Sequence, residues 1–162
     1  MDLTHALCKY SADENVKVGF IGGAPETLES MQAELTRLYP TINISYVFSP
    51  PFRELSDSEK QDIITDIRQS EINILFVGLG CPKQERWMAE NKHQLNCVML
   101  GVGAAFDFIA GNKKHAPQIM QKLGLEWLFR LLSEPKRLWK RYLSTNPKFV
   151  ALFLLQMLGK KF

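Results

Sequence analysis

Two glycine-bearing segments, each following an apolar run, contain the residues best suited to chemistry. They read Gly78-Leu79-Gly80-Cys81-Pro82-Lys83-Gln84-Glu85 and Gly101-Val102-Gly103-Ala104-Ala105-Phe106-Asp107. Glycine lets a backbone approach a ligand closely, and the N-terminus of a helix attracts anions. Lys83 can offer positive charge to a phosphate, and Gln84 can hydrogen-bond a sugar or a base. The alternative is that both side chains lie in an exposed first helical turn.

A third glycine pair and one carboxylate extend this pattern. Gly22-Gly23 follows an apolar run and precedes a predicted helix, so it is either a ligand-contacting turn or a tight turn without a ligand. Asp107 either binds a hydroxyl group or a metal ion, or caps a helix. The small residues from 103 to 105 leave room for a ligand or for a close helix. Together these turns suggest that backbone amides gather around a phosphorylated ligand.

Several established motifs are absent from the sequence. It has no P-loop and no GxGxxG fingerprint, which leaves an NAD site with little support. It also has no DxD pair, no zinc-ligand spacing among its three cysteines and three histidines, and no recognisable Ser/His/Asp or Cys/His arrangement. We therefore expect neither a metal ion nor a cofactor.

Positive charge is concentrated at the C-terminal end of the chain. Residues 1–112 carry 9 Lys and Arg against 15 Asp and Glu, whereas residues 113–162 carry 11 against two. A basic end on an acidic body suggests an anionic partner, namely phosphate, nucleic acid or a lipid surface, or else a solvated helical face. Arg137 and Arg141 are one helical turn apart with Trp139 between them, and arginine suits a diphosphate leaving group.

An apolar segment from Phe149 to Leu158 follows this basic stretch. It is too short to cross a bilayer, which takes about 20 residues, but long enough to enter a headgroup layer. Packing against the sheet or a second subunit explains the segment equally well. The sequence lacks a secretory signal, and its odd number of cysteines favours reduced thiols in a cytoplasm.

These residues need a scaffold of alternating strands and helices. Four apolar runs predict strands at Val16–Ile21, Ile42–Phe48, Ile72–Val77 and Cys97–Val102. Helices are predicted between them at Pro25–Leu38, Ser56–Ser70 and Lys83–His93. The expected buried helix positions are Leu28, Met31, Leu35 and Leu38, and then Ile63, Ile64 and Ile67. Ser56 and Glu59 have the spacing of a capping box.

Near-continuous apolar strands alternating with helices favour a parallel sheet that is covered on both faces. After Gly111 four short helices are expected, at Ala116–Leu123, Leu125–Ser133, Pro135–Leu143 and Pro147–Leu158. The predicted fold is therefore α/β: a Rossmann-like parallel sheet of about four strands with helices on both faces, plus a C-terminal helical appendage. The two predicted domains are residues 1–112 and residues 113–162.

Four motifs in this order resemble the WecB/TagA/CpsF family of bacterial glycosyltransferases. They are Gly22-Gly23-Ala24-Pro25, Gly78 to Glu85, Gly101 to Gly111 and Leu123 to Tyr142. The resemblance implies an inverting enzyme that moves a sugar, N-acetylmannosamine or another hexose, from a UDP-sugar to a polyprenyl-diphosphate-linked acceptor. Such enzymes act in the synthesis of teichoic acid, exopolysaccharide and other cell-surface polysaccharides, and are thought to need no metal.

The resemblance also implies roles for individual residues. Gln84 resembles a polar side chain that faces the donor sugar, while Arg130 and Arg137 resemble appendage arginines that neutralise the diphosphate. These three are the expected catalytic residues. The expected UDP-sugar-binding residues are Gly22, Gly23, Gly78, Gly80, Pro82, Lys83, Gln84, Gly103, Asp107 and Lys140. Lys140 stands where relatives often have arginine, which keeps the charge but not the bidentate fork.

On this resemblance, residues 1–112 form a nucleotide-sugar-binding domain, and residues 113–162 bind the inner face of the bacterial cytoplasmic membrane. Family members are typically longer, and the chain resembles them without the N-terminal third that carries a proposed general base. A homo-oligomer or a complementing N-terminal polypeptide is therefore among the expected partners. The alternative function is a truncated, noncatalytic module that binds UDP-sugar or membrane. A nucleic-acid-binding protein is the least favoured hypothesis, and no nucleic-acid partner is predicted.

Overall fold

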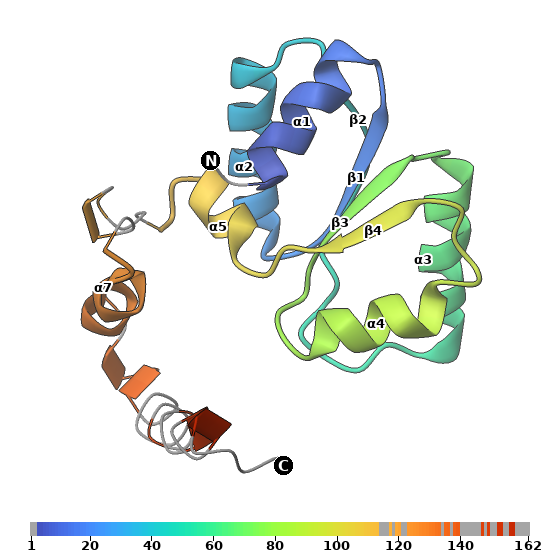
Figure 1. Ribbon diagram of the computed structural model, residues 1–162. Helices are drawn as coiled ribbons and strands as arrows, with labels where there is room; N and C mark the ends of the chain where they lie inside the picture. Colours follow the sequence, from blue (N-terminus) through green and yellow to red (C-terminus); the bar gives the residue numbers. More distant parts are fainter. Residues whose placement is uncertain are drawn as a thin grey trace. The chain divides into compact units, whose positions relative to one another are not determined.

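The computed structural model describes residues 3–113, 117, 119–120, 123–133, 135–136, 138–139, 147, 149, 152–153 and 156–157. The chain divides into two units, Met1–Lys114 and His115–Phe162. Figure 1 shows the first unit as a twisted sheet with helices on both of its faces. The candidate site residues that the structure describes lie mostly in this first unit.

Four parallel strands form the sheet, in the order β2-β1-β3-β4. They are β1 at Lys17–Gly22, β2 at Asn43–Phe48, β3 at Ile74–Gly78 and β4 at Val98–Gly101. Every predicted strand is present, and its bounds differ from the prediction by at most two residues. β1 and β3 are the central pair, and Phe20 of β1 stacks on Phe76 of β3 with ring centroids 5.1 Å apart.

Three predicted helices connect these strands, and all three are confirmed. They are α2 at Pro25–Leu38, α3 at Asp57–Gln69 and α4 at Lys83–Asn91. The capping box at the start of α3 is also confirmed, because the Ser56 hydroxyl accepts from the Glu59 N–H and the Glu59 side chain accepts from the Ser56 N–H. The expected buried positions are correct except for Leu38, which is 39% exposed because it is the last residue of α2.

Two further helices were not predicted, α1 at Leu3–Asp13 and α5 at Ala105–Ile109. The buried side of α1 consists of Thr4, Cys8, Ser11 and Ala12. These side chains are small or polar, so α1 lacks the apolar period that identifies a buried helix face. α5 has only five residues, which is too short to show a period.

The helices cover the two faces of the sheet unequally. One hydrophobic cluster joins α1, α2 and α5 to the sheet, and it contains Cys8, Val18, Phe20, Leu28, Met31, Leu35, Phe76, Phe106 and Ile109. A second cluster joins α3 and the opposite face, and it contains Ile21, Tyr46, Ile63, Ile64, Ile67, Ile72, Leu75, Val77 and Leu95. Trp87 and Met88 of α4 pack against the second cluster. The predicted Rossmann-like α/β fold is therefore confirmed.

The second unit contains helix α7 at Glu126–Ser133, which agrees with the helix predicted at Leu125–Ser133. In the other three helices predicted there, the described residues at 119–120, 135–136, 138–139, 147, 149, 152–153 and 156–157 are helical, whereas 117 and 123 are not. Their remaining positions lie outside the described residues. Across the described part of the chain, no helix is long and apolar enough to cross a membrane.

Candidate functional site

The glycine turns leave the sheet at one edge, because they follow the carboxyl ends of parallel strands. Gly22-Gly23 follows β1, Gly78 to Gly80 follow β3, and Gly103 follows β4. β1 connects through α2 on one face to β2, whereas β3 connects through α4 on the other face to β4. The two central strands therefore send their connections in opposite directions. Open α/β sheets bind ligands outside the strand ends at such a switch point.

Gly22 and Gly78 bring the ends of the two central strands into close contact. They are paired in the sheet, and a Cβ on Gly22 would lie 2.5 Å from the carbonyl carbon and oxygen of Gly78. Gly22 also has a φ of +118°, which side chains rarely adopt. Glycine is therefore required here by the approach of one backbone to another.

The ring of Phe106 packs directly under these turns. A Cβ on Gly78 would lie 2.5 Å from this ring, and a Cβ on Gly23 would lie 3.5 Å from it. Phe106 belongs to α5, is buried, and meets Phe20 edge-on with ring centroids 5.7 Å apart. Gly23 and Gly78 thus make room for this ring of α5.

Gln84 connects the turn after β3 to the turn after β4. Its side chain is only 6% exposed, its Oε1 accepts a hydrogen bond from the Gly103 N–H at 3.1 Å, and its Nε2 donates to Glu85 at 3.0 Å. A Cβ on Gly101 would lie 2.8 Å from this Nε2, so glycine makes room for the amide. The alternative that the Gln84 side chain is exposed is therefore wrong, because this side chain faces the turn after β4.

The loop that leads into α4 is open to solvent. Cys81, Pro82 and Lys83 are exposed, and Pro82 is the N-cap of α4 after a cis peptide bond. A Cβ on Gly80 would meet no atom within 4 Å. Lys83 lies in an exposed first turn, which leaves its ammonium group accessible to an anionic ligand.

The Asp107 carboxylate is partly exposed and pairs with a lysine of the same unit. It lies within α5, whose N-cap is Ala104, so the prediction that Asp107 caps a helix is wrong. Its Oδ2 is 3.5 Å from Nζ of Lys113. Asn112, which precedes Lys113, donates from its side-chain amide to the hydroxyl of the buried Thr27 of α2 at 3.1 Å. These contacts fix the end of the first unit against α2.

A fourth loop at this edge was missed by the sequence reasoning. Ser49 follows β2, and its hydroxyl donates to the carbonyl oxygen of Gly23 at 2.7 Å. Further along this loop Phe52 is 98% exposed, and Arg53 donates to the two carboxylate oxygens of Glu59 at 2.8 and 2.5 Å. The adjacent prolines at 50 and 51 were an available signal, since such a pair marks a stiff loop directly after a strand.

The predicted cations of the appendage belong to the second unit. Arg130 is in α7, whereas Arg137 and Lys140 lie outside the described residues. At the carboxyl edge of the sheet and the adjoining first turns of α4 and α5, the structure places Gly22, Gly23, Gly78, Gly80, Pro82, Lys83, Gln84, Gly103 and Asp107. Within the described ranges, no group of three or more His, Cys, Asp and Glu side chains is arranged to hold a metal ion.

Comparison with known proteins gives relatives for nearly all of the chain. It is 34% identical over 151 residues to N-acetylglucosaminyldiphosphoundecaprenol N-acetyl-beta-D-mannosaminyltransferase of Staphylococcus aureus strain MW2. Proteins of the same name from strains NCTC 8325 / PS 47 and COL are also 34% identical over 151 residues. Each alignment covers 93% of this chain but 57% of the relative, so the chain spans little more than half of their length.

The family match agrees with the arrangement of the glycine turns. Residues 1–162 match the protein family described as "Glycosyl transferase WecG/TagA/CpsF family". This match includes all of the turns at the carboxyl edge and extends through the basic appendage. The chain therefore belongs to the WecG/TagA/CpsF family of glycosyltransferases.

Proposed function

We propose that this chain binds a UDP-sugar at the carboxyl edge of its sheet and takes part in transferring the hexose to a polyprenyl-diphosphate-linked acceptor. The observation that carries the proposal is the hydrogen bond from the Gly103 N–H to Gln84 Oε1, which holds two glycine turns together. Glycine turns that open into helices favour phosphates because their N–H groups point outward. The names of the Staphylococcus aureus relatives support N-acetylmannosamine as the sugar and an undecaprenol-linked acceptor.

The proposed reaction is a direct displacement at the anomeric carbon of the donor. The acceptor hydroxyl oxygen forms a bond to that carbon, while the bond from the carbon to the diphosphate oxygen breaks and its electron pair leaves with UDP. A single displacement of this kind inverts the configuration of the carbon. The acceptor proton goes to a general base, a role that we assign to no residue of this chain.

The residues of this chain act mainly on the diphosphate and on the shape of the pocket. Backbone N–H groups of the turns and the exposed Lys83 bind the phosphates in this proposal. Arg130 and Arg137 neutralise the departing UDP, with Lys140 as a further cation. Gln84 acts by positioning, because its Oε1 is already bonded to the turn after β4.

The basic appendage is proposed to bind the cytoplasmic face of the membrane that anchors the acceptor. Its charge favours anionic lipid, and the side chains of Phe149 and Phe153 are 67% and 51% exposed. A second copy of this chain or a complementing N-terminal polypeptide is also proposed among its partners.

The second candidate function is a noncatalytic module that binds UDP-sugar or membrane. It needs only the glycine turns and the basic appendage, because binding UDP-sugar or membrane requires no general base. The two functions differ in turnover, because a module binds UDP without releasing it from a sugar.

Calorimetric titration of the chain with UDP and with UDP-N-acetylmannosamine tests the proposal. Both ligands should produce heat, and Gln84→Ala should weaken both. Gln32→Ala is the matched control, because Gln32 donates only to its own helix at Leu28. Folded protein that gives no heat with UDP or with any UDP-sugar would contradict the proposal. Heat without UDP release in the presence of a polyprenyl-diphosphate acceptor would favour the module.

A further inference from the structure

Phe52 has the most exposed large apolar side chain in the described part of the chain. It is 98% exposed, whereas the other exposed apolar side chains there range from 39% to 72%. A single exposed apolar residue is ordinary on a protein surface. Phe52 is unusual because the loop that presents it is held on both sides.

On the N-terminal side, the loop is fixed to the glycine turn after β1. The Ser49 hydroxyl donates to the Gly23 carbonyl at 2.7 Å, and Pro50 and Pro51 restrict the backbone between this bond and Phe52. On the C-terminal side, Arg53 forms a bidentate ion pair with Glu59 in the first turn of α3.

The ion pair is itself anchored by the capping box of α3. The Ser56 N–H donates to Glu59 at 2.8 Å, and the Glu59 N–H donates to the Ser56 hydroxyl at 3.2 Å. The Arg53 guanidinium and these capping bonds lower the pKa of Glu59 to about 2, so the carboxylate is charged at neutral pH. The Phe52 ring is therefore presented to solvent from a loop of restricted freedom.

The position of the loop relates Phe52 to the candidate site. β2 lies next to β1, so its loop leaves the sheet at the same edge as the glycine turns. The step from β3 across β1 to β2 is about 10 Å, since neighbouring strands are about 4.8 Å apart. A nucleoside diphosphate held at the turns after β3 and β4 has the length to reach this side of the edge.

We infer that Phe52 is a stacking platform for the base of the nucleotide donor, an inference that rests on the proposed function. An aromatic ring offers a flat face on which a base stacks without needing hydrogen bonds. The neighbouring charges agree with the neutral base at this end of the ligand, because Arg53 and Lys60 are both paired with carboxylates and Glu54 adds a negative charge. The diphosphate lies toward Lys83 and the glycine turns, away from these carboxylates.

The same charges oppose the main alternative for an exposed phenylalanine. A residue that enters a lipid surface usually lies among basic side chains, which are attracted to anionic headgroups. The segment from Arg53 to Lys60 has two cations and three carboxylates, a net charge of −1, and Lys60 pairs with Asp57 at 2.8 Å. This segment offers no excess positive charge to attract anionic headgroups, so a base fits this loop better than a membrane does.

The test compares UDP with pyrophosphate, which has the charges but lacks the base, by calorimetry at one ionic strength. Phe52→Ala should weaken UDP binding by about 5- to 100-fold, the range that the loss of one base–aromatic stack produces. It should leave pyrophosphate binding unchanged. Phe52→Trp should retain tight UDP binding, and Phe52→Leu should lose most of it.

The control variant is Tyr10→Ala, which removes another exposed aromatic ring, 54% exposed, from α1. It should leave both ligands unaffected. Equal UDP binding by Phe52→Ala and the unaltered protein would overturn the inference while leaving the proposed function intact. So would an equal loss for UDP and pyrophosphate, which indicates a general disturbance of the site. No UDP binding by the unaltered protein would instead overturn the proposed function, and the inference with it.

A second experiment, sedimentation with lipid vesicles, tests whether Phe52 contacts a membrane instead of a base. Sedimentation with vesicles of phosphatidylcholine and phosphatidylglycerol should be the same for Phe52→Ala and the unaltered protein. If the variant loses vesicle binding and keeps UDP binding, Phe52 contacts lipid and the inference is wrong.

Discussion

The buried side chain of Gln84 accepts the backbone N–H of Gly103 at 3.1 Å, which joins the loop after β3 to the loop after β4. The two residues are 19 positions apart, with Gln84 in the first turn of α4 and Gly103 in the turn after β4. The bond gives a structural reason for an amide at the second position of α4. The side chain that is expected to face the donor sugar thus also holds the backbone of the turn after β4.

Replacing Gln84 with alanine should loosen the turn after β4. The change leaves the Gly103 N–H without its partner, which should lower the free energy of unfolding by about 1–2 kcal/mol. Urea denaturation measures this loss, and hydrogen exchange at Gly103 should become faster. Gln32→Ala should show neither effect. An unchanged exchange rate at Gly103 in Gln84→Ala would show that the hydrogen bond is absent in solution.

Alanine at Gly22 should be far more damaging than alanine at Gly80. Both glycines have a positive φ, at +118° and +78°, but a Cβ on Gly22 would lie 2.5 Å from the backbone of Gly78, whereas a Cβ on Gly80 would meet no atom within 4 Å. Gly22→Ala should cost at least about 2 kcal/mol in the free energy of unfolding, and Gly80→Ala about 1 kcal/mol. Chemical denaturation of the two variants gives the comparison. Equal losses would mean that the strand ends are not packed together as described.

The anchor of the Phe52 loop should weaken in acid. The Arg53 side chain and the capping hydrogen bonds at Ser56 lower the pKa of Glu59 from 4.5 to about 2. Because the pKa is lower in the folded state, the stabilisation is complete above about pH 4.5 and disappears as the pH falls toward 2. The unaltered protein should therefore be more stable than Glu59→Gln at neutral pH, and the difference should shrink across this window in urea titrations.

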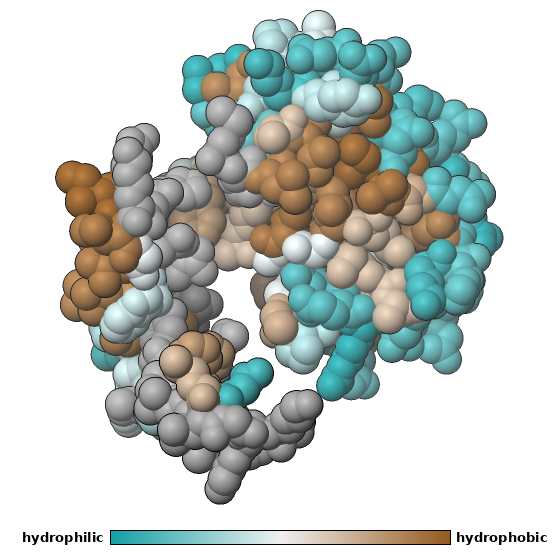
Figure 2. All heavy atoms as spheres, viewed as in Figure 1, coloured by the Kyte–Doolittle hydropathy of each residue, from teal (hydrophilic) through white to brown (hydrophobic). Residues whose placement is uncertain are grey.

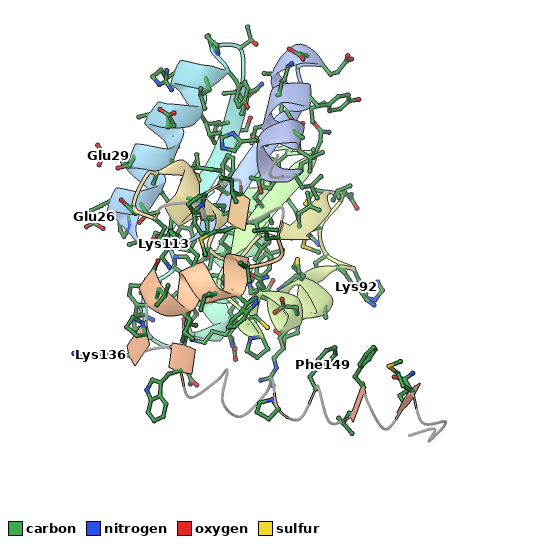
Figure 3. All side chains as sticks on the ribbon, turned by 60° about the vertical axis from the view of Figure 1, so that its left-hand side comes forward. Glu26, Glu29, Lys92, Lys113, Lys136 and Phe149 are labelled. Atoms are coloured by element: carbon green, nitrogen blue, oxygen red, sulfur yellow. The ribbon has the colours of Figure 1, made fainter. Side chains whose placement is uncertain are left out.

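The control for this pH series is Glu29→Gln. Figure 3 shows Glu26 and Glu29 on the outer side of α2, pointing away from the sheet. Removing the Glu29 charge should leave the acid dependence of the unaltered protein in place. If Glu59→Gln follows the same pH curve as the unaltered protein, the ion pair with Arg53 contributes nothing to stability.

Membrane binding by the appendage is tested by removing its last segment. Residues 144–162 contain Lys148, Lys160 and Lys161 together with exposed apolar side chains such as Phe149. The truncated chain should no longer sediment with anionic vesicles, and added salt should release the intact chain because charge attraction is screened. Sedimentation that survives the truncation would contradict this role.

The two central strands of the sheet, β1 and β3, could be predicted from sequence because most of their residues are buried. Residues such as Val18, Phe20 and Val77 are buried on one face or the other, which leaves a continuous apolar run in the sequence. Helix α3 was equally clear, since three isoleucines mark its buried face and a capping box marks its start. Helix α1 was missed because Thr4, Cys8 and Ser11 bury it without an apolar pattern.

The candidate site was predictable in its glycines but not in its contacts. A glycine next to a strand end indicates a turn, yet the sequence does not tell whether backbone, ring or ligand fills the space beside it. For Gly78 the neighbour is the ring of Phe106, which lies 28 positions later. The bond from Ser49 to Gly23 was also invisible, since it joins two loops through a hydroxyl that has no pattern in the sequence.

Helix α1 lies on the same face of the sheet as α2, since both pack into the cluster around Phe20. Connections between parallel strands are almost always right-handed, and α2 on this face leads from β1 toward the β2 side. A parallel strand joined to β1 through α1 would therefore have to come from the opposite side, where β3 and β4 already occupy the first two places. Its position would be beyond β4, whose Val98 is 62% exposed.

The outer edge of β4 has the backbone geometry to pair with such a strand. The N–H groups of Val98 and Val102 donate toward β3, so alternation turns those of Met99 and Gly101 outward. Figure 2 shows apolar side chains gathered between α1 and β4. If a fifth strand paired with β4 there, β4 would no longer be an edge strand. β3 would then be the central strand of the five-stranded sheet.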